Sequence, residues 1–77
     1  MRVLLNEEHV IDAAVISGSA VEGNYYVHIE YNGNLDRYVY DDSVSLEEAE
    51  ERWKKIVKEG FETGKIDCSN EPLEFID

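Results

Sequence analysis

The sequence has a single cysteine, Cys68, so it can form no intrachain disulfide bond. This cysteine usage is typical of a reducing compartment. The chain also lacks any apolar stretch near the roughly 18 residues that a membrane span requires. Its opening residues, MRVLLNEEHV, are too short in their apolar part for a signal peptide. We therefore predict a cytoplasmic protein that does not enter a membrane.

Basic residues are scarce as well. Seven Lys and Arg residues stand against 18 Asp and Glu residues, and the formal net charge is −11. Such a charge repels phosphate backbones and anionic lipids, which argues against direct nucleic-acid binding. It attracts basic macromolecules instead. The charge also exceeds the magnitude of about 2–8 that is usual for a small soluble domain.

The residue patterns of common catalytic and metal sites are missing too. A calcium loop starting at Asp41 fails, because Leu46 replaces the glycine of the sharp turn and Arg52 replaces the bidentate Glu. Zinc-binding Cys and His clusters and phosphate-binding glycine patterns do not occur. The histidines, His9 and His28, have no Ser or Cys placed beside them by the sequence pattern. We therefore predict no cofactor, no metal and no enzymatic activity; an enzyme or ligand-sequestering protein would need a concave pocket.

Hydrophobic residues make up 43% of the 77 residues, which is a globular composition. Residues 9–20 predict a first strand, with Ile11, Ala13 and Val15 on one side of the extended chain. Residues 18–24 are rich in turn formers and should return the chain.

Residues 25–31 are the clearest strand, because aromatic and β-branched residues alternate with other side chains. The following Asn32-Gly33 pair tolerates the positive φ angles of a type I′ turn. A two-residue loop at this pair predicts a hairpin in which Val27 lies opposite Tyr38. The helix-facing side should then hold Tyr25, Val27, Ile29, Tyr31, Tyr38 and Tyr40, and the other side Tyr26, His28, Glu30, Arg37 and Val39.

Two other registers of this hairpin remain open from the sequence. A loop at Gly33-Asn34 would set Glu30 opposite Arg37 and keep the same faces. A three-residue loop would set Glu30 opposite Asp36, a destabilising like-charge pair. The loops of even length are therefore favoured.

A helix follows, and its start is well marked. Ser45 is a favourable N-cap, and Glu48 three residues later completes a capping box. Apolar residues then recur at helical spacing and predict one buried stripe: Leu46, Ala49, Trp53, Ile56 and Val57. Gly60 is expected to end the helix, and Phe61 to fold back under its last turn.

The predicted fold is α+β, an antiparallel three-stranded β-meander with one amphipathic helix packed on one face. Residues 1–77 form a single domain in this prediction. Residues 65–69 can add a short strand. Residues 70–77 begin with a turn at Pro72 and end as a tail that packs either on the domain or on a partner.

The most distinctive feature is an acidic run, in which six of the eleven residues from Asp41 to Glu51 are acidic and none is basic. Acidic side chains in the first turn of a helix and basic side chains in its last turns interact favourably with the helix dipole. Part of the acidic charge therefore stabilises the helix. The pairs Glu48–Arg52, Glu50–Lys54 and Glu51–Lys55 have the favourable i,i+4 spacing and would leave the helix nearly neutral.

Some acidic residues have no such compensation. Asp41 and Asp42 precede the helix, where its lysines do not reach. After the helix, only Lys65 opposes six acids: Glu59, Glu62, Asp67, Glu71, Glu74 and Asp77. Carboxylates without counter-charges repel one another on a small body, and a basic partner would relieve that repulsion.

We therefore predict a non-enzymatic binding protein that engages a basic protein surface, with a homodimer as an alternative. In size and acidity the chain resembles small phage or mobile-element inhibitors that present carboxylates to nucleic-acid-binding surfaces, without a shared motif. The predicted partner-binding residues are Asp41, Asp42, Glu47, Glu48 and Glu51. In the alternative, a structural or regulatory domain associates with a copy of itself through Tyr26, Val39 and the C-terminal LEFID segment.

Overall fold

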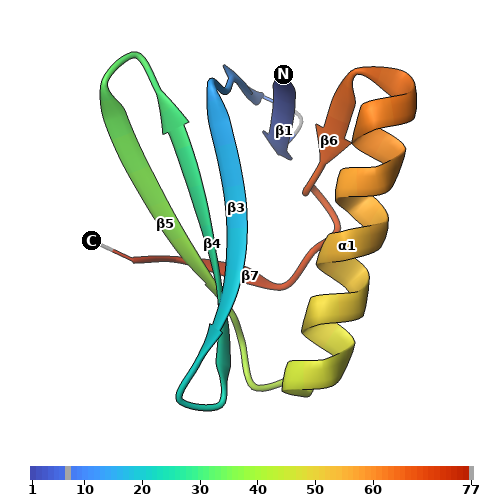
Figure 1. Ribbon diagram of the computed structural model, residues 1–77. Coiled ribbons are helices and arrows are strands. Elements are labelled where there is room, and N and C mark those ends of the chain that lie inside the picture. The colour runs from blue at the N-terminus through green and yellow to red at the C-terminus, as the bar shows by residue number, and fades with distance from the viewer. Residues whose placement is uncertain (7, 77) are drawn as a thin grey trace.

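A computed structural model describes residues 1–6 and 8–76 as two β-sheets and one helix (Figure 1). The larger sheet has the strand order β3-β4-β5-β7, and the smaller one has the order β2-β1-β6. The elements are β1 (Arg2–Asn6), β2 (His9–Asp12), β3 (Val15–Val21), β4 (Asn24–Tyr31), β5 (Asn34–Tyr40), α1 (Leu46–Thr63), β6 (Lys65–Asp67) and β7 (Leu73–Ile76). The α+β class is confirmed, but the prediction of a single three-stranded meander is wrong.

The β4–β5 hairpin has the predicted two-residue loop. Asn32 and Gly33 have φ angles of 47° and 76°, as a type I′ turn requires. The register sets Val27 opposite Tyr38 and Tyr31 opposite Asn34. The other two registers are therefore excluded. Tyr25, Val27, Ile29 and Tyr40 are buried, as the predicted faces require.

The predicted first strand is in fact two strands that belong to different sheets. β2 pairs with β1, whereas β3 pairs with β4. A bend between them at Ala14 shifts the alternation by one residue. As a result Ile11 and Ala13 are buried, but Val15 is 54% exposed and Ile16 packs against the core in its place.

The predicted turn over residues 18–24 is shorter than expected, because β3 continues to Val21. Glu22 and Gly23 form the loop, both with positive φ. Gly18 serves a different purpose inside β3. A Cβ atom at Gly18 would lie 2.4 Å from the Tyr25 hydroxyl and 2.6 Å from Cδ1 of Trp53. Glycine therefore allows both rings to pack closely over the strand, and Trp53 meets the sheet as predicted.

Helix α1 begins as predicted and ends later than predicted. The Ser45 Oγ accepts a hydrogen bond of 3.2 Å from the Glu48 backbone N–H, which confirms the N-cap. Gly64 is the residue that ends the helix, with a φ of 80° and its N–H donating to the Gly60 carbonyl over 2.7 Å. The prediction that Gly60 ends the helix is wrong: Gly60 is buried within α1, and a Cβ there would lie 2.5 Å from Cγ1 of Ile66. The prediction for Phe61 is also wrong, since its side chain is 75% exposed.

The C-terminal segment contributes a strand to each sheet. β6 confirms the predicted short strand and runs parallel to β1, with Val3 opposite Ile66. β7 pairs antiparallel with β5, with Tyr40 opposite Leu73. The segment from Leu73 to Ile76 is thus part of the larger sheet, and Asp77 lies outside the described residues.

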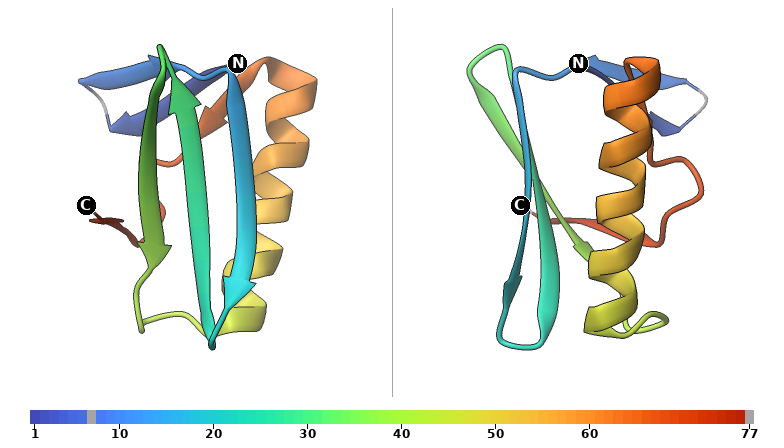
Figure 2. Two further views of the ribbon diagram at one scale, coloured as in Figure 1. Left: turned by 60° about the vertical axis from the view of Figure 1, so that its left-hand side comes forward. Right: turned by 45° about the vertical axis from the view of Figure 1, so that its right-hand side comes forward.

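One core lies between the larger sheet and α1, and the smaller sheet lies at one end of it (Figure 2). The side chains of Val3, Val27, Ile29 and Ile66 are fully buried, so both sheets contribute to this core. No helix in the described part of the chain is long and apolar enough to cross a membrane.

Candidate functional site

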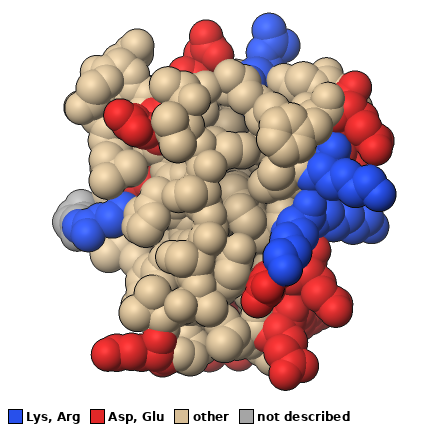
Figure 3. All heavy atoms as spheres, viewed as in Figure 1, with Lys and Arg blue, Asp and Glu red and all other residues tan. Residues whose placement is uncertain are grey.

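The acidic run lies at the end of the molecule where β5 leads into α1. Asp41 and Asp42 follow β5 directly, and Glu47, Glu48 and Glu51 lie in the first two turns of the helix. Figure 3 shows Asp and Glu side chains at this end, Lys and Arg side chains further along the helix, and further Asp and Glu side chains at the opposite end. The five residues that the sequence analysis predicts to bind a partner therefore lie at one end of the molecule.

A tight turn fixes the start of the acidic run. The Asp41 Oδ1 accepts hydrogen bonds from the backbone N–H and the hydroxyl of Ser43, the former over 2.8 Å. These bonds from Ser43 lower the pKa of the Asp41 carboxyl. The Asp41 backbone N–H also donates to the Pro72 carbonyl over 3.0 Å, which ties the turn to the C-terminal segment. Asp41 is therefore an ionised residue with a structural role, whereas Asp42 is exposed.

Next to this turn, a hollow of about 230 Å³ opens on the surface. Three carboxylates line it, from Asp41, Asp42 and Glu74, and one wall holds the ring of Tyr26. The remaining lining residues are Asn24, Val39 and Tyr40, so no Lys or Arg contributes to it. Within the described residues, no group of three or more His, Cys, Asp or Glu side chains is arranged to hold a metal ion.

The ion pairs of α1 only partly compensate the acidic run. Lys54 pairs with Glu50 over 2.7 Å, as predicted. The predicted Glu48–Arg52 pair is present at the long distance of 4.0 Å. The predicted Glu51–Lys55 pair is not among the ion pairs that the described residues form. Glu47 and Glu51 are thus exposed carboxylates that form none of the close ion pairs of the described chain.

Arg52 is held mainly by Glu71 and reaches Glu48 of the acidic run only at 4.0 Å. Its Nε and Nη2 atoms donate to the two carboxylate oxygens of Glu71, each over 3.1 Å. The hydroxyl of Tyr40 donates to the same carboxylate over 2.8 Å. Hydrogen bonding to Glu71 raises the pKa of Arg52, and burial together with this carboxylate raises the pKa of Tyr40. The expectation that Glu71 lacks compensation is therefore wrong, and the base nearest to the acidic run is already engaged.

The other candidate reactive groups are in ordinary surroundings. Cys68 is buried, and burial raises the pKa of its thiol to about 12, which opposes formation of the reactive thiolate. His28 lies opposite Arg37 in the β4–β5 pair, on the predicted outer face of the sheet. His9 is exposed at the start of β2.

The sequence pattern missed two features of the surface. Glu74 joins the hollow only because β7 pairs with β5, with Glu74 opposite Val39, and no local pattern reports that pairing. An open apolar groove between β3 and α1 was also missed, although Phe61 falls four residues after Val57 and so continues the apolar stripe beyond Gly60.

Comparison of the chain with protein-family models, with curated proteins and with solved structures finds no match.

Proposed function

We propose that this protein is a non-enzymatic binding protein that engages a basic surface of another protein. The observation that carries the proposal is the hollow beside Tyr26, where Asp41, Asp42 and Glu74 present carboxylates and no basic residue opposes them. A hollow of about 230 Å³ has room for the end of a long basic side chain. Arg and Lys are the residues whose donors match such a set of acceptors.

The chemistry of the hollow favours arginine in particular. A planar guanidinium can bond two carboxylates at once and can also stack on an aromatic ring such as that of Tyr26. Glu47 and Glu51 do not line the hollow and are exposed on the first two turns of α1 at the same end of the molecule. These exposed charges contribute mainly by steering a basic partner toward the hollow and raising the association rate.

Proteins that bind nucleic acid present such a surface, with several Arg and Lys side chains placed for phosphates. We therefore propose a nucleic-acid-binding protein as the partner, which this chain would inhibit by occupying the basic surface. Its net charge of −11 then acts as a substitute for the phosphate charge. Competition between this chain and a short DNA or RNA duplex for the purified partner tests this part of the proposal.

The partner is to be captured from extracts of the source cells on the immobilised chain, eluted with salt, identified and purified. Its affinity is then measured by titration calorimetry. We expect a fall of at least about 10-fold between about 0.05 M and about 0.3 M salt, because exposed charges are screened over that range. An affinity that does not change with salt would contradict the electrostatic mechanism.

A pair of variants with equal net charge locates the binding surface. The test variant carries Asp42→Asn, Glu47→Gln and Glu74→Gln, which are exposed residues at the acidic end. The control carries Glu30→Gln, Glu59→Gln and Glu62→Gln, which are exposed and lie outside the acidic run and the hollow. We expect the test variant to lose at least about 10-fold in affinity and the control to lose about 2-fold at most. Equal losses would mean that only total charge matters.

A further inference from the structure

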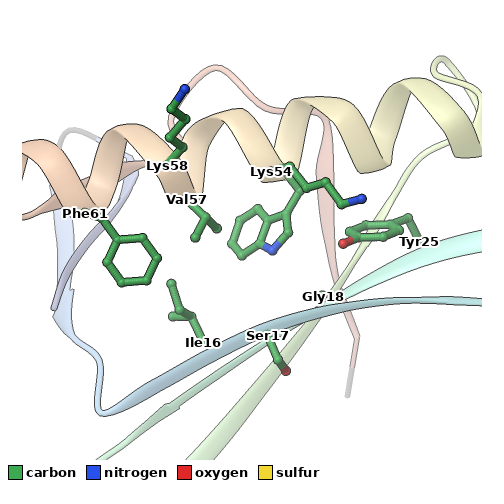
Figure 4. A pocket seen from close by; sticks show the side chains of 9 residues that line it. Ile16, Ser17, Gly18, Tyr25, Lys54, Val57, Lys58 and Phe61 are labelled. Carbon is green, nitrogen blue, oxygen red and sulfur yellow. The ribbon is translucent and has the colours of Figure 1, made fainter.

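A second surface, distinct from the acidic end, lies between β3 and α1. Here a groove of about 460 Å³ is open to solvent, within the range of about 300–1,000 Å³ that is usual for ligand sites. Figure 4 shows Val57 and Phe61 pointing into it from the helix and Ile16 from the strand. Phe61 is the most exposed of the large apolar side chains in the described chain, at 75%. An exposed aromatic ring at the mouth of an apolar groove indicates an interaction surface.

The strand that borders this groove also has an open edge. β3 pairs with β4 on one side and is the last strand of its sheet on the other. Its seven residues, VISGSAV, contain no charged residue and no proline, and its pairing with β4 has no register shift. Natural proteins usually protect an edge of this length with Lys, Pro or a bulge. β3 has none of these devices. A helix can also cover an edge, but α1 lies on one face of the sheet and not in its plane (Figure 2), so the backbone N–H and C=O groups of β3 can pair with an added strand.

The charge of the groove is the reverse of that of the chain. Of its nine lining residues none is acidic and two are lysines, Lys54 and Lys58, although the chain carries 18 acids and seven bases. Lys54 pairs with Glu50 over 2.7 Å. Lys58 forms none of the ion pairs within the described chain, and Figure 4 shows its ammonium group pointing away from β3, at the outer rim of the groove. A ligand with a carboxylate beside its apolar side chains would therefore be complementary to this groove.

The position of the helix decides which kind of strand can be added. In the left view of Figure 2, α1 lies past the open edge of β3, on one side of the sheet. Two copies that joined their β3 edges in antiparallel fashion would have both helices on the same side of the joint sheet. Both helices would then need the same space over the joint. A single extended peptide carries no helix that could clash with α1, so it fits along β3 beneath α1.

We propose that the β3–α1 groove binds an extended peptide segment of mixed apolar and acidic composition. The segment adds to the larger sheet as a further strand beside β3. Its alternate side chains, which point to one face of a strand, enter the groove between Ile16, Val57 and Phe61. A carboxylate of the segment that stays at the outer rim, rather than inside the groove, pairs with Lys58. Main-chain hydrogen bonds supply the affinity and the groove supplies the selectivity, as in other strand additions.

The first test is a selection from a library of random peptides as long as β3, which has seven residues. The library is displayed on phage and selected on the immobilised chain. We expect enriched sequences with large apolar residues at alternate positions and Asp or Glu rather than Lys or Arg. Enrichment of basic peptides, or of none, would overturn the proposal.

Variants then show whether the selected peptides use the groove. Phe61→Ser and Lys58→Glu should each weaken binding of a synthetic selected peptide at least about 10-fold in fluorescence anisotropy. The matched controls are Leu35→Ser, an exposed apolar residue on β5, and Lys55→Glu, an exposed lysine outside the groove. Circular dichroism verifies that each variant is folded. Equal losses in the variants and their controls would overturn the proposal.

Hydrogen exchange measures the added strand directly. Amides of β3 that bond to β4 should exchange slowly in the free protein, and the amides on the open edge should become protected only when the peptide binds. The expected result is new protection at alternate residues of β3. Peptide binding without new protection in β3 would exclude strand addition. Because these results do not depend on the acidic end, they stand or fall separately from the proposed function.

Discussion

The substitution Glu71→Gln removes one negative charge and leaves the size of the side chain almost unchanged. In the native chain this carboxylate accepts three hydrogen bonds, two from Arg52 and one from Tyr40. It therefore joins α1 and β5 to the segment that leads into β7. The glutamine side chain of the variant keeps one oxygen acceptor, but it replaces the other with an amide group that would face the donors of Arg52.

The expected cost follows from the hydrogen bonds and the burial of this group. A hydrogen bond to a charged group contributes about 1.5–3 kcal/mol, against about 0.5–1.5 kcal/mol for a neutral one. The Glu71 side chain is 11% exposed, so it is largely withdrawn from water. Solvent near its partner weakens the effect. For Glu71→Gln we expect a loss of about 1–2 kcal/mol in the free energy of unfolding.

The assay is urea unfolding followed by fluorescence of Trp53, the single tryptophan, which is 3% exposed in the folded chain. Glu74→Gln is the control, because Glu74 is exposed on the neighbouring strand β7. We expect the control to change stability by less than about 0.5 kcal/mol. Equal effects of the two substitutions would refute the reasoning that the Glu71 bonds hold the C-terminal segment in place.

Gly60→Ala should lower the free energy of unfolding by about 1 kcal/mol in urea denaturation. The added methyl group overpacks the core, and this destabilises the chain more than the higher helix propensity of alanine stabilises it. Its Cβ would lie 2.5 Å from Cγ1 of Ile66, so a stabilised variant would contradict this packing. Gly64→Ala should also destabilise by about 1 kcal/mol, because φ is 80° there; an unchanged urea midpoint would argue against this helix end. Burial raises the pKa of the Cys68 thiol and of the Tyr38 hydroxyl, each to about 12. The unfolded chain therefore loses these protons first, and stability should fall as pH rises from about 9 to about 12; a constant urea midpoint would exclude this. At about pH 8, iodoacetamide should react with Cys68 only as fast as the chain opens, whereas reaction at the rate of free cysteine would mean an exposed thiol.

Elements with a strong local signal were predictable from the sequence. The β4–β5 hairpin has an Asn-Gly loop between two alternating strands, and its register follows from the loop length. The start of α1 follows from Ser45, whose hydroxyl oxygen accepts the Glu48 amide hydrogen bond. In both places the decisive interaction joins residues that are close in sequence.

The missed elements depend on partners far away in the chain. β1 is stabilised by β2 on one side and by β6 on the other, and Val3 and Ile66 become neighbours only in the folded chain. The residues of β1, RVLLN, show no clear alternation of apolar and polar side chains, so they carry no local signal of a strand. Gly60 was misassigned for a similar reason. Gly60 lies close to Ile66 only in the folded chain, so the sequence around Gly60 does not report this contact. The same local sequence does suggest a helix end, because glycine is common there.

In the candidate site, too, the residues with a local sequence signal were predicted and those that depend on distant partners were missed. Asp41, Asp42, Glu47, Glu48 and Glu51 were named because they form one run in the sequence. The pairing of Glu71 with Arg52, and the approach of Glu74 to Tyr26, follow from the path of the C-terminal segment. Ionic partners separated by about twenty residues or more cannot be inferred from helical spacing, which reports only pairs three or four residues apart.

The most direct test of the central claim is to map the partner's footprint on the chain by NMR. The ¹⁵N-labelled protein is titrated with the purified partner, and changes in the amide signals are followed along the sequence. We expect the largest changes at Asp41, Asp42 and the first two turns of α1, together with Tyr26 and Glu74 around the hollow. Changes centred on β3 and Phe61, with the start of α1 unaffected, would contradict the central claim.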